Sequence, residues 1–347
     1  MTPDLPDIAA AARLLEQGRL VAFPTETVYG LGADAENPAA IARIYAAKGR
    51  PSNHPLIVHL AVNADLAFWV GAIPAQASAL IERFWPGPLT LILPRAAHIP
   101  EAVAGGQRSI GVRCPSHPVA QALLQTFKQG RGGIAAPSAN KFGHVSPTTA
   151  QHVRDEFSAE IDTESGQETT IAAILDGGQS EVGIESSILD LTRLDTHGPV
   201  LLRPGRITAL EMADVLGAIP AMPAVHDAMT PRASGTLDAH YAPLTPLAIV
   251  TGAALDDWLN HLHAAQRRVA LLHWSERSLL PAMPSVQLPA TPAGYAHALY
   301  ASLRAMDVTA VDVILLEQPP HTAGWQAIND RLRRAAFDSV GILERLL

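Results

Sequence analysis

The C-terminal part of the chain alternates between strand-like and helix-like segments, and this alternation limits the fold more than any other feature. Short apolar runs and amphipathic segments follow one another in the order 247–250, 254–265, 269–272, 291–306, 311–316 and 325–336. Strands that alternate with long helices form parallel sheets, because each connection must return across the sheet. The pattern predicts a small parallel α/β domain, Rossmann-like in type, over residues 247–347.

The first 216 residues carry the same kinds of segment in a less regular order. Helix-like segments and strand-like runs are mixed there: 7–17, 20–23, 37–47, 56–60, 75–84, 91–94, 108–115, 133–136, 172–176, 200–203 and 208–216. Because 347 residues exceed the usual size of one domain, two domains are expected. We predict an α/β domain over residues 1–216 and a linker over residues 217–246, where Ala, Pro and Met are common and periodicity is weak.

Composition excludes several classes of protein. No apolar run approaches the roughly 20 residues that span a bilayer, and the N-terminus does not resemble a signal peptide, so we expect a cytoplasmic protein that does not bind membranes. The single cysteine, Cys114, excludes an internal disulfide and a multi-cysteine zinc site, and it is expected to be a buried small hydrophobe. A net charge of -8 argues against a generally basic surface that binds nucleic acid, although a local basic pocket stays open.

A polar loop follows the apolar run 133–136. Ser138 and Asn140 hold hydrogen-bonding groups close to the backbone, and Ser146-Pro147-Thr148-Thr149 resembles a helix N-cap with proline at the first helical position. Such a loop suits a phosphorylated ligand, which amides, hydroxyls and a helix N-terminus can bind together. The alternative is an ordinary connection between a strand and a helix.

Two other loops carry groups suited to binding a ligand. Residues 25–32 place two threonines, a carboxylate and a tyrosine beside two glycines where a strand ends, a common location of ligand loops, although a tight turn would also need the glycines. Lys48 and Arg50 flank a glycine in a loop that Pro51 and Pro55 stiffen, so both cations can converge on one ligand. Ordinary surface charges are the alternative.

Four further polar side chains lie in or after strand-like runs. Alternation places Ser109 and Arg113 on one face of residues 108–115, and an arginine there needs an anionic partner or solvent. Arg203 lies at the end of another strand, and His59 is either a ligand or a satisfied core histidine. Neither a glycine-rich dinucleotide fingerprint nor a GxxxxGK[ST] loop occurs.

In combination these motifs resemble a known family. Residues 23–32 (FPTETVYGLG), 48–51 (KGRP), 137–140 (PSAN), 146–148 (SPT), 202–205 (LRPG) and 240–243 (HYAP) occur in the order seen in the two-domain threonylcarbamoyl-AMP synthases, the YrdC-type family. The resemblance covers nearly the whole chain. It implies an N-terminal twisted α/β YrdC-like domain with a large cavity, a linker that closes over the cavity as a lid, and a small C-terminal α/β domain.

The resemblance also implies a reaction. L-threonine, bicarbonate or CO2 and ATP would give threonylcarbamoyl-AMP and pyrophosphate, with Mg2+ on the phosphates. The product would serve the threonylcarbamoyladenosine modification of tRNA, so downstream tRNA threonylcarbamoyl-transferase proteins are the expected partners. This chemistry needs no covalent nucleophile, because positioning and cations can supply most of the catalysis.

Site residues follow from the resemblance, position by position. The matching catalytic positions are Lys48, Arg50, Ser138 and Asn140. Threonine contacts fall on Thr27, His59, Arg113, Ser138 and Ser186, with the adjacent Ser187 as the alternative to Ser186. ATP contacts fall on Arg50, His54, Ser109, Asn140, Thr148, Arg203 and Tyr241, with Asn53 as the alternative to His54. The chain departs from the family in the linker, where residues 234–237 (SGTL) replace a segment that carries a lysine in many members, and Arg232 is the candidate substitute.

Two other functions compete with this one. An RNA-binding or ribosome-associated module is the runner-up, since related single domains are thought to bind double-stranded RNA. Carbamoyl transfer in hydrogenase maturation fails, because the chain lacks zinc-finger cysteines. Arg331, Arg333 and Arg334 on the last predicted helix indicate either a docking face or, more simply, a solvated helix.

Overall fold

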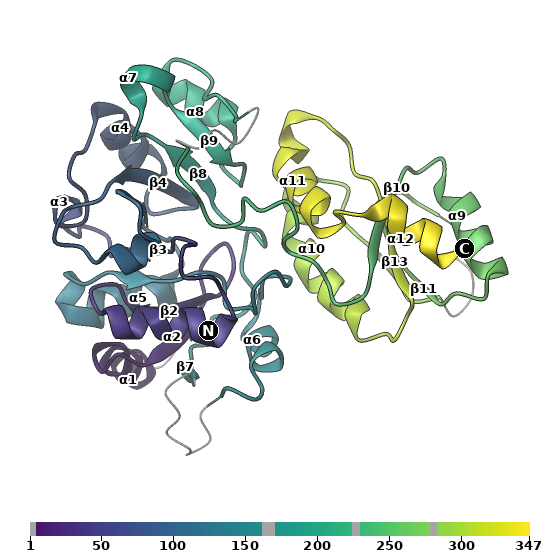
Figure 1. The fold of residues 1–347 in the computed structure, drawn as a ribbon, viewed down its shortest axis with the longest axis horizontal. Helices are drawn as coiled ribbons and strands as arrows, with labels where there is room; N and C mark the ends of the chain where they lie inside the picture. Colours follow the sequence, from purple (N-terminus) through teal and green to yellow (C-terminus); the bar gives the residue numbers. More distant parts are fainter. Residues whose placement is uncertain (1–4, 162–170, 224–229, 278–282) are drawn as a thin grey trace. The chain divides into compact units, whose positions relative to one another are not determined.

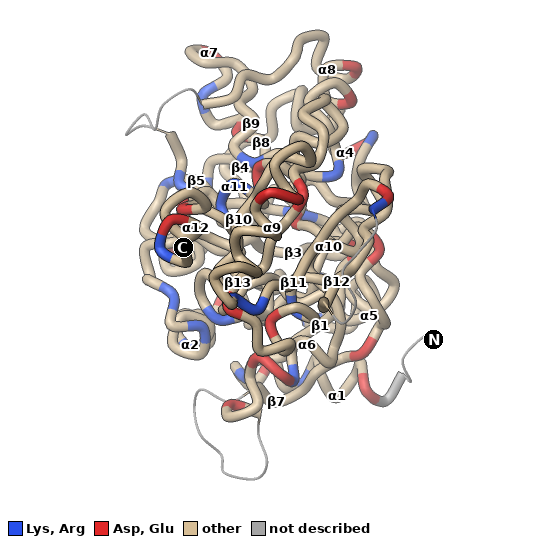
Figure 2. Tube along the Cα trace, turned by 90° about the vertical axis from the view of Figure 1, so that its right-hand side faces the viewer, with Lys and Arg blue, Asp and Glu red and all other residues tan. Residues whose placement is uncertain are grey.

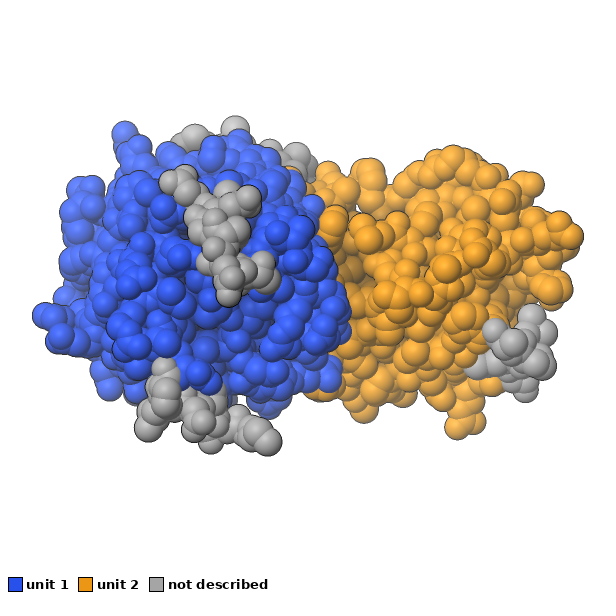
Figure 3. All heavy atoms as spheres, turned by 90° about the horizontal axis from the view of Figure 1, so that it is seen from below, with its two compact units in different colours: residues 1–142, 147–236 blue, residues 143–146, 237–347 orange. Residues whose placement is uncertain are grey.

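The computed structural model describes residues 5–161, 171–223, 230–277 and 283–347, and the chain divides into two compact units. Unit 1 comprises Met1–Phe142 and Pro147–Thr236, and unit 2 comprises Gly143–Ser146 and Leu237–Leu347. Figure 3 colours the two units. The division after Thr236 lies within the expected linker, and a four-residue segment that follows the Ser138 and Asn140 loop belongs to unit 2.

A nine-stranded mixed sheet forms the centre of unit 1 (Figure 1). Its strands lie in the order β7-β1-β2-β6-β3-β5-β4-β8-β9. In chain order their bounds are β1 Leu20–Phe23, β2 Gly30–Asp34, β3 Ile57–His59, β4 Leu89–Pro94, β5 Ser109–Arg113, β6 Ile134–Ala135, β7 Ile171–Ile174, β8 Ser187–Asp190 and β9 Val200–Arg203. Strands β3 and β5 are parallel neighbours, which places His59 opposite Arg113.

Strand β2 corrects the prediction that residues 25–32 are all loop. Gly32 lies inside this strand, and a Cβ atom there would come within 2.8 Å of the Ile134 side chain and 2.9 Å of Phe23. Close packing between neighbouring strands therefore requires this glycine, whereas the sequence suggested a turn.

Helices cover much of this sheet. They are α1 Leu5–Glu16, α2 Pro38–Lys48, α3 Leu66–Trp69, α4 Ala75–Phe84, α5 Pro118–Thr126, α6 Ala150–Glu156, α7 Leu194–His197 and α8 Ala209–Leu216, with short 3-10 turns η1 Glu101–Ala104 and η2 Phe127–Gly130. One core joins α2, α4, α6 and α8 to the sheet, and a second core joins α1 and α5 to β1 and β6.

Part of the sheet is covered by the linker. Side chains from β3, β4, β8 and β9 form a small apolar cluster whose remaining member is Ala233, from the stretch expected to be a linker. Ile110 and Val112 of β5 belong to the large helix-covered core, so Ser109, Gly111 and Arg113 point the other way, as alternation predicted. The open part of the sheet is therefore the place where polar side chains collect.

The start of α6 differs from the sequence-based prediction. Thr149 is the N-cap, because its side chain accepts a hydrogen bond from His152 N at 3.1 Å. The prediction of a cap at Ser146 with Pro147 as the first helical residue is wrong. Pro147 precedes the helix, and its carbonyl accepts a hydrogen bond from Tyr29 N at 2.9 Å.

Unit 2 contains a four-stranded, fully parallel sheet in the order β10-β13-β11-β12, which confirms the predicted α/β domain. Its elements are β10 Leu247–Val250, α9 Leu255–Ala264, β11 Val269–His273, β12 Ser285–Gln287, α10 Pro292–Asp307, β13 Val313–Glu317, η3 Ala323–Trp325, α11 Gln326–Ala335 and α12 Ser339–Leu346. Strand β12 and helix α12 were missed. Three partly exposed residues are too few to show strand periodicity, and α12 follows α11 almost directly.

The arginines of α11 are not a solvated or docking face. Arg331 is fully buried with its guanidinium carbon 5.3 Å from the centre of the Tyr241 ring, and Arg334 donates to Leu237 O. Arg333 alone of the three is exposed. Both expectations for this helix are wrong, because two arginines bind residues 237–241 within unit 2.

The placement of charged side chains and the hydropathy of the helices agree with what the composition indicated. Lys and Arg are interspersed with Asp and Glu along the described part of the trace (Figure 2). Among the described residues, no helix has the length and apolar character needed to cross a membrane.

Candidate active site

The loop that carries Ser138 and Asn140 is fixed to its surroundings by Lys48. The Lys48 ammonium donates to Ser138 O at 2.6 Å and to Asn140 O. Lys48 is 2% exposed, and burial lowers its pKa well below the ordinary value, with the nearby Arg50 charge acting in the same direction. Lys48 therefore acts here through the main chain of the loop.

Arg50 and Arg203 meet through one linker residue. Arg50 Nη2 donates to Ser234 Oγ at 3.3 Å, and Arg203 Nη1 donates to Ser234 O at 2.8 Å. Arg203 Nη2 also donates to Ser186 Oγ at 3.1 Å, and that hydroxyl lies 2.8 Å from Thr90 Oγ1. Two predicted ATP contacts and one predicted threonine contact thus form a continuous polar chain.

The adjacent serine has a different role. Ser187 Oγ donates to Ile207 O at 2.6 Å, so it stabilises the start of β8. Of the two serines at this point in the motif, Ser186 is the one bonded to Arg203.

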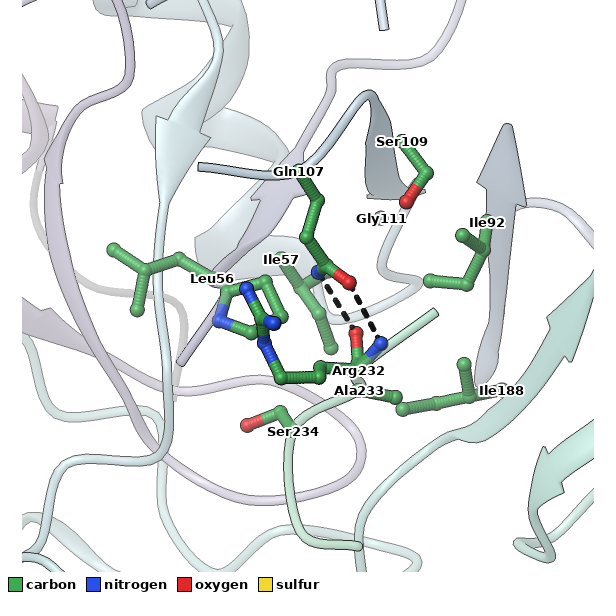
Figure 4. A pocket seen from close by; sticks show the side chains of 11 residues that line it. Leu56, Ile57, Ile92, Gln107, Ser109, Gly111, Ile188, Arg232, Ala233 and Ser234 are labelled. Atoms are coloured by element: carbon green, nitrogen blue, oxygen red, sulfur yellow. Dashed lines mark hydrogen bonds between the residues drawn. The ribbon is translucent and has the colours of Figure 1, made fainter. Parts of the chain in front are cut away.

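Residues 232–234 cover a narrow pocket on the open part of the sheet (Figure 4). Gln107 holds this segment by two main-chain hydrogen bonds, Nε2 to Arg232 O at 3.1 Å and Arg232 N to Oε1 at 2.7 Å. The pocket is lined by Pro55, Leu56, Ile57, Ile92, Gln107, Ser109, Gly111, Ile188, Arg232, Ala233 and Ser234. The predicted ATP contact Ser109 therefore shares a pocket with the covering segment.

Arg232 does not reach into that pocket as a free cation. Its Nε donates to Asn53 O at 3.2 Å, and its Nη2 donates to Gly105 O at 3.0 Å. In this conformation Arg232 anchors the covering segment to two loops of unit 1.

Arg113 is surrounded by polar groups at the end of β5. Its Nη1 donates to Thr27 Oγ1 at 2.9 Å, its Nε donates to Gly87 O at 3.3 Å, and its Nη2 lies 2.7 Å from Glu26 Oε1. The anionic partner that the sequence required is therefore Glu26. The structure brings together Thr27 and Arg113, two of the predicted threonine contacts.

His59 lies beside Arg113 in the sheet and is 4% exposed. Burial, with the Arg113 charge as a smaller cause, lowers the pKa of His59 to about 3. The imidazole is neutral at physiological pH, so it can exchange hydrogen bonds with a ligand without adding a charge.

His54 and Phe142 complete the surroundings of Arg50. The His54 ring meets the Phe142 ring edge to face at 5.3 Å, and the Arg50 guanidinium carbon is 5.7 Å from the centre of the same ring. Burial lowers the pKa of His54, and the Arg50 charge adds to this effect. Phe142 is thus a platform for two predicted ATP contacts, and it was missed because an apolar ring carries no polar signal in the sequence.

Two predicted ATP contacts have other partners. Thr148 Oγ1 is 3.4 Å from His152 Nδ1. Tyr241 belongs to unit 2, where its ring stacks on Tyr300 at 5.9 Å. Within its own unit, Tyr241 is therefore packed between Tyr300 and Arg331.

Cys114 is a buried residue, as predicted. It is 4% exposed, and burial raises the pKa of its thiol to about 11. A thiol with that pKa stays protonated and is a poor nucleophile.

Comparison with known proteins identifies the family. A family model described as "Telomere recombination" matches residues 13–205, and a model described as "Threonylcarbamoyl-AMP synthase, C-terminal domain" matches residues 207–337. The threonylcarbamoyl-AMP synthase of Pyrococcus abyssi is 38% identical over 337 residues, covering 95% of this chain and 94% of that protein. This chain belongs to the threonylcarbamoyl-AMP synthase family.

Two further comparisons with members of the threonylcarbamoyl-AMP synthase family support this assignment. The Bacillus subtilis protein of that name is 40% identical over 342 residues, covering 95% of this chain and 93% of its own length. The crystal structure of P. abyssi Sua5 complexed with L-threonine has a TM-score of 0.87 at 36% identity, covering 98% of this chain and 96% of that one. The family resemblance and the two-domain α/β fold expected from the sequence are confirmed.

The site has no evident metal-binding cluster of its own. Within the described ranges, no group of three or more His, Cys, Asp and Glu side chains could hold an ion. The described residues therefore do not form an all-protein cage for Mg2+, which usually binds nucleotide sites through one or two carboxylates and the phosphates themselves. They fit a site in which cationic side chains meet an anionic substrate directly.

Sequence reasoning missed four polar residues of the site: Glu26, Thr90, Gln107 and Ser234. Glu26 offered the clearest signal, because a buried arginine on β5 requires a carboxylate and Glu26 lies in a motif that carries predicted ligands. The other three act through contacts between segments far apart in the chain, which no local pattern reveals.

Proposed function

We propose that this chain catalyses the synthesis of threonylcarbamoyl-AMP from L-threonine, bicarbonate or CO2, and ATP, with release of pyrophosphate. The observation that carries the proposal is full-length membership of the family, combined with four buried cations, Lys48, Arg50, Arg113 and Arg203, around the open part of one sheet. Cations collected in a site of low dielectric can bind a carboxylate and a polyphosphate together.

The polar chain around Ser234 is the proposed phosphate region. Arg50 and Arg203 can grip phosphate oxygens bidentately, and they now hold the hydroxyl and carbonyl of Ser234. ATP must therefore rearrange or replace the contacts of Ser234. Asn140 and Thr148 are the further proposed contacts of ATP, with His54, Ser109 and Tyr241.

The Arg113 region is the proposed threonine site. The related P. abyssi protein was crystallised in complex with L-threonine, which supports an amino-acid site in this fold. Arg113 would bind the substrate carboxylate, with Thr27, His59, Ser138 and Ser186 supplying neutral hydrogen-bonding groups. A carbamate oxygen would then attack the α-phosphorus, and cations would stabilise the charge that develops there.

The remaining parts of the proposal concern what accompanies the reaction. Mg2+ would enter as the counter-ion of ATP, and no step here depends on a protein ligand to it. The product would pass to a tRNA threonylcarbamoyl-transferase, which places the proposed reaction in the cytoplasm. The RNA-binding alternative has less support, given the net charge of -8.

Pyrophosphate release tests the proposal. The purified protein, supplied with ATP, Mg2+ and bicarbonate, is compared with L-threonine, with L-serine and without an amino acid. We expect release that requires both threonine and bicarbonate and falls strongly with serine. A folded protein that releases none under any of these conditions would refute the activity.

A further inference from the structure

Glu26 is a buried carboxylate that the predicted site did not include. It lies in the bend that follows β1, its side chain is 5% exposed, and its Oε1 is 2.7 Å from Arg113 Nη2. Its main-chain carbonyl accepts a hydrogen bond from Val182 N at 2.7 Å, which fixes the bend. The position of this carboxylate is therefore well determined on the threonine side of the proposed site.

The bonding of Glu26 is incomplete. A carboxylate can accept about four hydrogen bonds. Apart from the ion pair, neither Oε1 nor Oε2 accepts one with acceptable geometry from any residue that the structure describes. Burying an ionised carboxylate that accepts no hydrogen bonds costs free energy. The Glu26 carboxylate is therefore suited to accept a hydrogen bond from a donor group on a ligand.

The charges around Glu26 show what kind of donor is missing. Three titratable groups that interact with it are Arg113 at the end of β5, Cys114 directly after that strand, and His117 just before α5. Burial keeps Cys114 protonated and lowers the pKa of His117, so both are neutral near pH 7. Arg113 is the cation among these three groups. A ligand that binds Arg113 occupies some of its hydrogen-bond donors, so Glu26 then needs a second positive group as a partner.

An α-amino acid supplies that group at the required place. Its ammonium nitrogen is two bonds from its carboxyl carbon, so an amino acid whose carboxylate meets Arg113 brings its ammonium beside the carboxylate that already contacts this guanidinium. We propose that Glu26 binds the α-ammonium group of the substrate and positions its nitrogen in the site. This inference rests on the proposed function, and it makes Glu26 the residue that selects amino acids over hydroxy acids.

Ligand binding to the full-length protein tests the inference. L-Threonine is compared with (R)-3-hydroxybutyrate, which keeps the carboxylate and hydroxyl but lacks the amine, by titration calorimetry on wild type and Glu26→Gln. We expect wild type to bind threonine at least about 30-fold more tightly than the hydroxy acid. Glu26→Gln should weaken threonine about 30-fold and change the hydroxy acid by less than about threefold.

Glu317→Gln is the matched control, because it changes a buried carboxylate of unit 2 and should leave both affinities unchanged. If Glu26→Gln does not fold, Glu26→Asp is the alternative variant, because it keeps the charge on a side chain that is one methylene shorter. It should weaken the binding of threonine at least about tenfold more than the binding of the hydroxy acid.

The outcomes separate two failures. Equal weakening of both ligands, or of neither, would overturn the inference and leave Glu26 as the counter-ion of Arg113. Wild-type protein that binds neither acid would contradict the proposed function, and this inference with it.

Discussion

Two buried glutamates, one in each unit, differ in how completely they are bonded. Glu317 at the end of β13 accepts from the main-chain N atoms of Trp274 and Ser275, both at 3.0 Å, from Ser275 Oγ at 2.7 Å and from Arg277 at 3.4 Å. These hydrogen bonds outweigh burial and lower the pKa of Glu317. Glu26 in unit 1 has an ion pair and no hydrogen bond from a described residue.

The difference indicates where each unit can accept a ligand. The carboxyl edge of a parallel sheet is the usual ligand site of an α/β fold, yet unit 2 directs its edge carboxylate at its own backbone. Unit 1 keeps charged side chains that bond to main-chain carbonyls, to a serine and to one another. For these two glutamates, complete internal bonding favours a structural role for Glu317, and incomplete bonding favours a ligand contact for Glu26.

The largest effect is expected in the phosphate region of unit 1. Arg50→Ala or Asn140→Ala should lower adenylate formation at least about 100-fold, because each removes a group that we propose contacts the phosphates of ATP. Steady-state pyrophosphate release measures this loss, and thermal unfolding checks the fold. Arg206→Ala is the matched control, since that side chain is 53% exposed and its loss should change turnover less than about twofold. Near wild-type turnover in either site variant would refute the assignment.

The next effect concerns the fully bonded carboxylate. Glu317→Gln should lower the free energy of unfolding by about 2 kcal/mol, because several hydrogen bonds to a charged acceptor weaken together. Turnover per folded molecule should not change. Chemical denaturation and an activity measurement on the same sample test both statements. A loss of turnover with unchanged stability would show that Glu317 has a functional role and not a structural one.

His59, a buried base in unit 1, should make the stability of the folded protein depend on pH. His59 has a pKa of about 3 in the folded protein, whereas an exposed histidine has one near 6.5. Between these values the unfolded state takes up the proton first, so falling pH favours unfolding by about 1.4 kcal/mol per pH unit. Unfolding of wild type and His59→Asn, compared from pH 7 to pH 4, should show this slope in the difference. Parallel curves would mean that His59 titrates normally.

The smallest effect is expected at the linker. Gln107→Ala removes two of the hydrogen bonds that hold Arg232, so residues 232–234 should open more often. We expect limited proteolysis of the linker to become about fivefold faster, since neutral hydrogen bonds contribute about 1 kcal/mol. Arg131→Ala, an exposed change elsewhere in unit 1, is the control. Unchanged cleavage would show that other contacts hold this segment.

The sequence predicted the regular elements well where amphipathic periodicity was long. The helices of unit 2 at residues 292–307 and 326–335 lie within two residues of their predicted ends. Strand β2 was missed because Gly30 and Gly32 indicate turns when they are considered locally, and their packing against β1 and β6 becomes visible only in the sheet.

The site was partly predictable for a related reason. Residue type and motif order selected Arg50, Arg113 and Arg203, because an arginine in or beside a strand needs an anionic partner or solvent. Their partners Glu26 and Ser234 come from distant segments, and nothing in the local sequence fixes those pairings. The prediction for α11 was wrong because helical periodicity does not show that Arg331 and Arg334 contact residues 237–241.

Isotope incorporation tests the central claim most directly. The protein is incubated with ATP, Mg2+, L-threonine and 13C-bicarbonate, and the nucleotide products are analysed by mass spectrometry. We predict a new adenylate that carries threonine and one labelled carbon and that disappears when threonine is omitted. ATP consumption that yields only unlabelled AMP or ADP would contradict the account.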